Sequence, residues 1–300
     1  MNIGRSLFLI VANVIFIATI AEGQARVEKN VLVGMHSGLA LVMDVHHPEN
    51  PNGYGIVHIS GSGWRRPLAY SAPLLSESQV NLYGQPLVER GYTVFSLNHR
   101  ATPRFQFPAP LEDVQRAVRF IRYHAAEYGI DPDRIGAVGG SSGGHLVSML
   151  GVLDGDGDSE DPDAVNRVHA KVQTVVARAA PADLARIETT SGRGALALLM
   201  GALPSQDPQS VETQLYRKAS PVNYVSKDDP PILLLHGDAD ETVPFEQAEL
   251  FSRALTAAGV ETRLITIPGA GHGPTFRGAV NPPDYIGAMI AWFEEHLKKR

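Results

Sequence analysis

The sequence predicts an α/β fold in which helices cover both faces of a mostly parallel β-sheet. Short strand-like runs alternate along the chain with longer segments whose apolar residues recur at helical spacing. This alternation is typical of parallel sheets that are buried on both faces. The 300 residues, 44% of them hydrophobic, can bury a sizeable core. No internal repeat and no linker composition divide the chain after its N-terminal segment.

The alternation consists of eight strand-like runs and five helical patterns. In chain order, strands are expected at residues 30–33, 41–45, 55–60, 93–98, 134–138, 172–179, 232–236 and 262–267. Helices are expected at residues 79–90, 111–128, 142–153, 245–258 and 283–298. The strands and helices succeed one another as in the units from which parallel sheets are built.

The glycine-rich stretch after the fifth predicted strand has the pattern of a nucleophile elbow. It reads RIGAVGGSSGGHLVSMLG, an apolar run followed by paired glycines, two serines, two more glycines and a helical pattern. In G-x-S-x-G the serine lies on a strained strand-to-helix turn, where side chains on the flanking residues would clash. Two registers fit, with either Ser141 or Ser142 as the nucleophile. Ser141 is preferred because it lies closer to the apolar run and leaves Ser142 to supply the next backbone N–H.

An acid and then a histidine are expected later in the chain if the elbow belongs to a hydrolase. The apolar run PPILLLHG is followed by DADETVP, which offers Asp238, Asp240 and Glu241. The run TRLITIP is followed by GAGHG, which places His272 between glycines. Both loops follow strands, where open α/β sheets bind their ligands. Asp240 is preferred as the acid, with Asp238 as the alternative.

Position distinguishes His272 among the eleven histidines of the chain. His296 is the only other histidine after the acid loop, and it falls in the polar terminal helix, where a surface position is expected. His145 and His236 lie beside the catalytic segments and are interpreted as structural residues.

A second glycine-rich turn can supply donors to a developing oxyanion. The run GIVHIS leads into GSGW at residues 61–64. Backbone N–H groups in this turn can approach a substrate oxygen because little side chain intervenes. The N-terminus of the helix that follows the elbow adds further N–H groups.

Two segments do not follow the alternation. Residues 154–167, DGDGDSEDPDAVNR, are expected to form a solvated acidic loop. Their opening resembles a calcium-binding loop, but Ser159 stands where that loop needs glycine and Val165 where it needs glutamate. Residues 187–219 are expected to form a small helical insertion that overhangs the active site as a partial cap.

Residues 1–25 are expected to be a signal peptide. Arg5 precedes an apolar stretch at residues 7–20, and the small residues of AEGQA suit cleavage near Ala21 or Ala25. The stretch is short for a transmembrane helix, so export to the periplasm or the medium is preferred to an uncleaved membrane anchor, which is the alternative. The chain has no cysteine, so no disulfide bond can stabilise the exported domain of residues 26–300.

Taken together, these motifs resemble the α/β-hydrolase esterases of the hormone-sensitive-lipase and feruloyl/acetylxylan esterase type. The resemblance rests on ISGSGW, YTVFSLNHR, FPAPLEDVQRAVRFIR, RIGAVGGSSGGHL, SPVNYV, PPILLLHGDADETVPFEQAELF and PGAGHG, which stand in the family's order. It extends over roughly residues 30–298 and implies the α/β-hydrolase fold and serine-hydrolase chemistry.

The resemblance also implies the roles of individual residues. It implies a catalytic triad of Ser141, Asp240 and His272. It implies backbone donors to the oxyanion at three positions, namely Ser62, Gly63 and Ser142. The family's H-G-G-G-W loop reads SGSGW here, so Ser60 replaces the histidine that commonly braces the loop.

The sequence therefore predicts a serine carboxylesterase that works by two-step acyl transfer without a metal or organic cofactor. A serine peptidase of the prolyl-oligopeptidase type is an alternative, although such enzymes usually carry a large extra domain. A non-catalytic hydrolase-fold binding protein is another, although such proteins normally lack a member of the triad. The net charge of −6 and the lack of long basic runs argue against nucleic acid as a partner. The expected substrate is a small-molecule or carbohydrate ester, with the side-chain esters of polysaccharides as candidates.

Aromatic residues in two loops suggest the size of the substrate. Trp64 follows the glycine turn and is expected to contact the substrate. Phe105 and Phe107 lie in the proline-containing loop at residues 101–110 and are expected near the mouth of the site. Since no extended apolar lid is evident, short acyl chains of about C2 to C4 or a compact aromatic acyl group are favoured.

Overall fold

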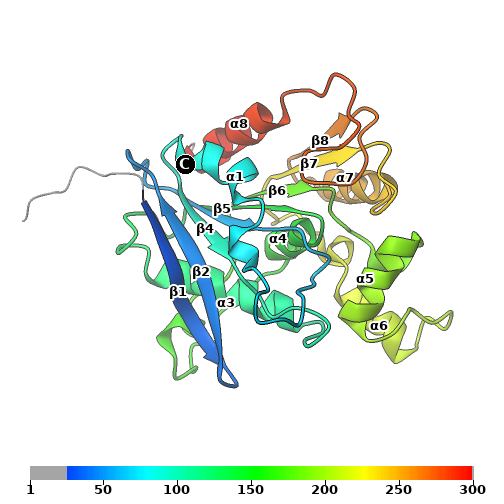
Figure 1. The fold of residues 1–300 in the computed structure, drawn as a ribbon, viewed down its shortest axis with the longest axis horizontal. Helices are drawn as coiled ribbons and strands as arrows, with labels where there is room; N and C mark the ends of the chain where they lie inside the picture. Colours follow the sequence, from blue (N-terminus) through cyan, green and yellow to red (C-terminus); the bar gives the residue numbers. More distant parts are fainter. Residues whose placement is uncertain (1–25, 299–300) are drawn as a thin grey trace, which may run out of the picture.

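The computed structural model describes residues 26–298, which form an eight-stranded sheet flanked by helices (Figure 1). The strand order is β1-β2-β4-β3-β5-β6-β7-β8. The two pairs β1–β2 and β2–β4 are antiparallel, and all other neighbouring strands are parallel. The predicted α/β class and mostly parallel sheet are therefore confirmed. The predicted signal peptide lies outside the described residues.

Each of the eight predicted strands is present. The strands are β1 (Arg26–His36), β2 (Leu39–His47), β3 (Gly55–Ile59), β4 (Thr93–Leu97), β5 (Ile135–Gly140), β6 (Thr174–Arg178), β7 (Ile232–Gly237) and β8 (Thr262–Ile267). The helices are α1 (Val80–Tyr83), α2 (Gln85–Val88), α3 (Ala109–Tyr123), α4 (Ser142–Val152), α5 (Thr190–Met200), α6 (Val211–Lys218), α7 (Glu246–Ala258) and α8 (Tyr285–Lys298). The single helix expected at residues 79–90 is instead the two short helices α1 and α2. Pro86 lies at the start of α2 and has no N–H to continue the hydrogen bonding of α1.

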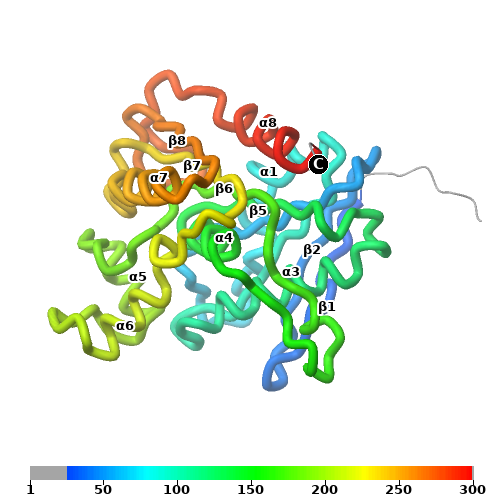
Figure 2. Tube along the Cα trace, turned by 180° about the vertical axis from the view of Figure 1, so that it is seen from behind, coloured from blue at the N-terminus to red at the C-terminus, as the bar shows by residue number. Residues whose placement is uncertain are grey.

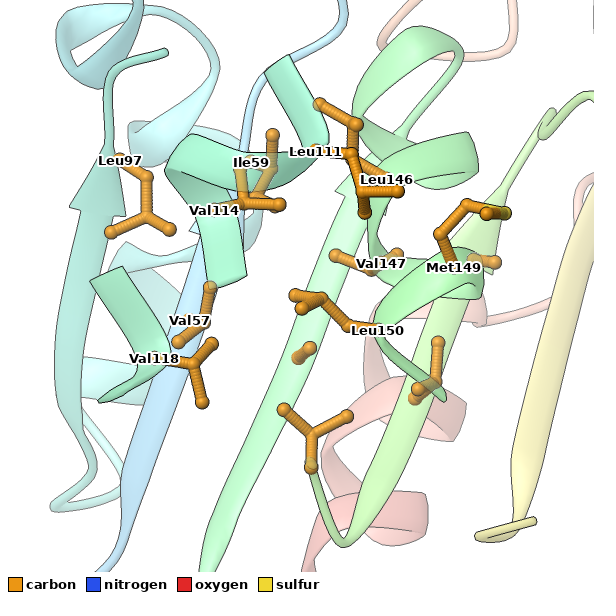
Figure 3. Close-up of a cluster of buried hydrophobic side chains, with 14 of the residues drawn as sticks. Val57, Ile59, Leu97, Leu111, Val114, Val118, Leu146, Val147, Met149 and Leu150 are labelled. Carbon is orange, nitrogen blue, oxygen red and sulfur yellow. The ribbon is translucent and has the colours of Figure 1, made fainter. Parts of the chain in front are cut away.

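The strands are apolar on both faces because helices cover both. In β3, Val57 belongs to a cluster with α3 and α4, whereas its neighbour Ile56 belongs to a second cluster with α1, α2 and α8. Figure 3 shows side chains of α3 and α4 packed against β3 and β4 in the first cluster. From behind, Figure 2 shows α8 on one side of the sheet and α3 and α4 on the other. The helices pack against both faces of the sheet. The loops at the carboxyl ends of the parallel strands, where such sheets bind ligands, are therefore attached to a packed core.

The chain between β6 and β7 contains the helices α5 and α6, which project beyond the sheet in Figure 1. Thr189 caps α5 by accepting the N–H of Gly192, and Gly201 ends the helix with a left-handed φ of 78°. Ser210 caps α6 by accepting the N–H of Thr213.

The acidic segment that begins at Asp154 contains no regular structure before a short 3-10 turn at Ala164–Arg167. Side chains of α3 hold this segment. Arg119 donates to the carbonyls of Gly155 and Asp156, and Arg116 pairs with Asp163 at 2.8 Å. Within residues 26–298, no cluster of three or more metal-ligating side chains is present. In the same range, no helix has both the length and the apolar character needed to cross a bilayer.

Candidate active site

Ser141 lies on the sharp turn between β5 and α4, in the middle of the predicted elbow. Its φ of 52° and ψ of −122° are rarely adopted by residues with a side chain. A Cβ at Gly139 would lie 2.5 Å from the Gly143 carbonyl oxygen, and one at Gly143 would lie 2.1 Å from the Ile59 carbonyl oxygen. These clashes explain why glycine is needed on either side of the serine. The Ser141 N–H donates to the Arg178 carbonyl at 2.8 Å, which ties the turn to β6.

The structure brings Ser141, His272 and Asp240 into one chain of hydrogen bonds. His272 lies in the loop after β8, and Asp240 lies in the loop after β7. His272 Nδ1 is 2.7 Å from Asp240 Oδ2, and His272 Nε2 is 2.9 Å from Ser141 Oγ. With Nδ1–H donated to the carboxylate, Nε2 is free to accept the serine O–H. Ser142, in the alternative register, is the first residue of α4, and its side chain is buried away from His272.

Asp240 is held by both of its oxygens. Oδ1 accepts the N–H groups of Thr242 and Val243 at 2.8 and 2.9 Å, which leaves Oδ2 for His272. Burial alone would raise the pKa of Asp240, but hydrogen bonds from His236 and His272 outweigh it and hold the pKa below its usual value. The carboxylate is therefore ionised at neutral pH.

Asp238, the alternative acid, has a different environment. It is exposed, and its Oδ1 accepts the N–H of Gly269 at 2.7 Å. This bond joins the loop after β7 to the loop after β8, so Asp238 has a structural contact of its own. The structure does not bring it to His272.

The three predicted oxyanion donors do not have the same surroundings. The N–H groups of Gly63 and Ser142 have no hydrogen-bond partner among the described residues. The N–H of Ser62 instead donates to Ser142 Oγ at 2.9 Å. Ser62 therefore departs from the expectation of a free donor, because the neighbouring hydroxyl already accepts its N–H.

Gln79 holds the loop of residues 61–64, here called the oxyanion loop because it carries two of the predicted donors. Its role was not identified from the sequence. Its side-chain Nε2 donates to the Gly61 carbonyl at 3.0 Å, and its Oε1 accepts the Gly61 N–H at 3.4 Å. Gln79 adopts a left-handed φ of 59° just before α1, within a segment whose pattern predicts a continuous helix. The Ser60 hydroxyl, expected to substitute for a bracing histidine, donates to the Ser78 carbonyl. Both contacts hold the loop from the segment that precedes α1.

Trp64 and His145 connect the oxyanion loop to the insertion. The Trp64 indole N–H donates to His145 Nδ1 at 3.3 Å, and His145 Nε2–H donates to the Ala219 carbonyl at 2.6 Å. Burial lowers the pKa of His145 to about 4, so it is neutral and can accept from Trp64. Trp64 lines the cavity at Ser141 but is only 3% exposed, so most of its ring packs inside the protein.

A cavity of about 290 Å³ lies over Ser141 and His272. Residues of α5 and the loops beside it form an apolar wall, which consists of Ile187, Ala195, Leu196 and Val243. The first part of the insertion thus forms one wall of the cavity. Neither of the two phenylalanines expected at the mouth of the site lines this cavity. Phe105 lines a separate groove with Arg66 and Leu68, and Phe107 packs against the main core beside α5, where its N–H donates to the Leu199 carbonyl at 2.9 Å.

Arg178, at the end of β6, is a further residue of the cavity that sequence reasoning missed. It is 2% exposed. Its Nη1 donates to the Gly273 carbonyl at 2.6 Å, next to His272 in the chain. Its guanidinium lies over the rings of Tyr83 and Phe276, 5.2 and 5.4 Å from their centroids. Residues of a buried central strand are normally apolar. The sequence pattern therefore predicts a buried strand at this position but no functional arginine.

Known proteins that are similar to this chain include named esterases. The BD-FAE family model matches residues 43–255. Esterase LipQ of Mycobacterium tuberculosis is 32% identical over 225 residues, which cover 72% of this chain and 49% of LipQ. The probable carboxylic ester hydrolase LipM of the same organism is 34% identical over 203 residues, which cover 63% of this chain and 46% of LipM. The chain spans about half the length of these curated relatives.

Solved structures with the same fold include carbohydrate-directed enzymes. A truncated form of a carbohydrate esterase from gut microbiota superposes with a TM-score of 0.73 and 29% identity, over 93% of this chain and 99% of that one. An acetyl ester-xyloside bifunctional hydrolase from Caldicellulosiruptor lactoaceticus gives a TM-score of 0.75 and 26% identity, over 92% and 98% of the two chains. The α/β-hydrolase fold expected from the sequence is thereby confirmed.

Proposed function

The chain belongs to the BD-FAE family, and on this premise we propose that it is a serine esterase that hydrolyses short-chain carboxylic esters. The observation that carries the proposal is the hydrogen-bonded chain from Asp240 through His272 to Ser141, with the serine on a strained turn at the head of α4. Relatives that are named esterases support the reaction class.

In the proposed mechanism, His272 Nε2 removes the proton from the Ser141 hydroxyl as its oxygen attacks the ester carbonyl carbon. The ionised Asp240 fixes the imidazole through Nδ1–H and stabilises the imidazolium that forms. His272 then gives its proton to the leaving alcohol. In the second half, water attacks the acyl-serine with His272 again as the base, which releases the acid and restores Ser141.

The developing oxyanion is proposed to accept hydrogen bonds from the N–H groups of Gly63 and Ser142. Both groups lack a partner among the described residues, and both belong to residues next to the cavity or the nucleophile. Ser62 contributes indirectly, because its N–H holds the loop against Ser142. Loss of one such donor typically reduces kcat by a factor of about 100 to 1,000.

The cavity supports a small substrate. Its volume of about 290 Å³ is at the lower end of the range of about 300 to 1,000 Å³ found for ligand pockets. Helix α5, within the predicted cap of residues 187–219, forms one wall of it. Acetyl and other short acyl esters therefore fit better than long fatty acyl chains. Side-chain esters of polysaccharides are included in the proposal, because two relatives in structure carry names of carbohydrate-directed enzymes. Export through the N-terminal segment, outside the described residues, would bring the enzyme to such substrates.

A fluorophosphonate probe tests the proposal directly, because it reacts with activated serines in this chemistry. The wild-type protein is expected to be labelled in minutes and to hydrolyse p-nitrophenyl acetate, whereas Ser141→Ala is expected to do neither. Absence of labelling and of hydrolysis in the folded wild-type protein would leave a binding protein as the better account.

A further inference from the structure

The charges around the cavity differ from those of the whole chain. The formal net charge of the chain is −6, yet the cavity is lined by two arginines, Arg65 and Arg178. Among the described residues, no aspartate or glutamate lines it. Fixed positive charges beside a cavity with low-dielectric walls raise the local concentration of anions. Two arginines therefore lie at the wall of the cavity, and the ionised Asp240 lies behind His272 rather than in the lining.

Arg178 differs from the partly buried Arg100 and the buried Arg122 in how its charge is compensated. Arg100 pairs with Asp113 and Glu112, both within 3 Å. Arg122 donates through Nε, Nη1 and Nη2 to three backbone carbonyls. Arg178 donates to one carbonyl, that of Gly273, and lies over the rings of Tyr83 and Phe276. Asp240 is near enough to favour its charge, but no carboxylate lies within 4 Å among the described residues, and the buried Nε of Arg178 has no hydrogen-bond partner there. A buried cation is costly when it lacks an anionic partner, so this residue has unused capacity for an anion.

Arg178 lies close to the proposed catalytic residues Ser141 and His272. Its Nη2 lies 2.1 Å from the point that a Cβ of Gly140 would occupy, and Gly140 directly precedes Ser141. Its Nη1 binds the residue after His272. An anionic group that reached the guanidinium would therefore belong to a molecule whose ester carbonyl lies at Ser141, separated by only a few bonds.

Arg65 supplies a second positive charge on the solvent side. It is exposed, lines the same cavity, and has no side-chain partner among the described residues. Its Nε lies 3.3 Å from the point that a Cβ of Gly63 would occupy. Because it is exposed at the cavity, it can attract an anionic ester before Arg178 binds it.

We infer that the substrate is an ester that carries a carboxylate within a few bonds of the scissile carbonyl, and that Arg178, assisted by Arg65, binds this carboxylate. The apolar wall at Ile187 and Leu196 receives the other, uncharged part of the ester. Arginine suits this role because its planar guanidinium can donate two hydrogen bonds to one carboxylate. The inference rests on the proposed esterase function and adds the charge of the substrate to it.

Two pairs of esters, matched in chain length, test the inference by pH-stat at constant ionic strength. Monoethyl glutarate is compared with ethyl valerate, which places the carboxylate on the acyl side. The second pair, 4-acetoxybutyrate and butyl acetate, places it on the alcohol side. In at least one pair, kcat/KM is expected to be at least about tenfold higher for the anionic ester, as one charge-assisted hydrogen bond of about 1.5 kcal/mol allows.

Variants assign this preference to the arginines. Arg178→Met is expected to remove the preference for the anionic ester. The preference is measured as the ratio of kcat/KM for the two esters of a pair, because a general loss of activity affects both values equally. Arg178→Lys retains the charge but loses the paired hydrogen bonds, so it is expected to keep only part of the ratio. Arg65→Met is expected to reduce the ratio partly, and added salt should reduce this contribution. The matched control is Arg122→Met, which removes a buried arginine far from the cavity and should keep the wild-type ratio.

Hydrolysis of the neutral esters without preference in either pair would overturn the inference and leave the esterase intact. A preference that survives Arg178→Met would also overturn it. If wild-type protein hydrolysed none of the four esters and reacted with no fluorophosphonate, the esterase proposal itself would fail, and the inference with it.

Discussion

The Ser62 backbone N–H donates to the Ser142 hydroxyl at 2.9 Å, across 80 residues of sequence. This bond joins the oxyanion loop after β3 to the first residue of α4, on either side of Ser141. Ser142 therefore contributes more than the backbone N–H that the elbow pattern assigns to it. Its hydroxyl fixes the distance between the two segments that supply the proposed oxyanion donors.

Ser142→Ala should lower kcat by no more than about tenfold, with little change in KM. One neutral hydrogen bond contributes about 1 kcal/mol, and the Ser142 backbone N–H remains in place. The kinetics of p-nitrophenyl acetate hydrolysis measure this effect. Ser148→Ala is the matched control, because it removes a buried hydroxyl of the same helix that donates to the Gly144 carbonyl, and it should leave kcat unchanged. A loss of several orders of magnitude in Ser142→Ala would show that the elbow uses the other register.

Asp240→Asn should reduce kcat by about 10⁴-fold, because the amide can present its N–H to His272 and stabilise the wrong tautomer. Asp238→Asn should reduce it less than about threefold, since the Asp238 side chain accepts the Gly269 N–H and has no hydrogen bond to His272. Steady-state kinetics of both variants at pH 8 decide between the two acids. Equal losses would contradict the assignment of Asp240.

The apolar wall predicts the range of acyl chains. On a series of p-nitrophenyl esters, kcat/KM should fall steeply beyond about C6, because the cavity is small and each methylene contributes only about 1 kcal/mol. Leu196→Ala removes side-chain volume from the wall and should move the optimum to longer chains. A wild-type rate that rises to C10 would contradict a cavity of this small size.

Two buried histidines predict that the protein loses stability in mild acid. Burial lowers the pKa of His58 to about 3 and that of His145 to about 4, below the ordinary value of 6.5. The unfolded chain therefore binds protons first as pH falls, so stability is complete above pH 6.5 and decreases toward the folded-state pKa. Between pH 8 and pH 5 each histidine should reduce the free energy of unfolding by about 2 kcal/mol.

Denaturant unfolding of the wild-type protein and of His58→Gln at both pH values measures the contribution of His58. The free energy of unfolding differs between pH 8 and pH 5, and this difference should be smaller by about 2 kcal/mol in the variant than in the wild type. The exposed His36 provides the control, and His36→Gln should retain the wild-type difference. An unchanged difference in His58→Gln would show that His58 takes no part.

The strands and the members of the candidate triad could be predicted because their signals are local. Each of Ser141, Asp240 and His272 follows a strand, and neighbouring parallel strands end at the same edge of a sheet. The bond from Ser62 to Ser142 could not be predicted, because it joins side chain and backbone of two loops distant in sequence. The role of Gln79 was hidden in the same way, since its left-handed backbone interrupts a helix-like pattern. That Phe105 and Phe107 do not line the cavity could not be predicted either, because the path of an irregular loop depends on packing and leaves no periodic pattern in the sequence.

The central claim is that Ser141 is the nucleophile, and the turnover of Ser141→Ala on p-nitrophenyl acetate tests it most directly. We predict that kcat falls by about 10⁴- to 10⁶-fold while the thermal unfolding midpoint stays within a few degrees of the wild type, because the residual rate rests on binding and the oxyanion hole alone. A folded Ser141→Ala protein that keeps more than about a tenth of the wild-type kcat would contradict the account.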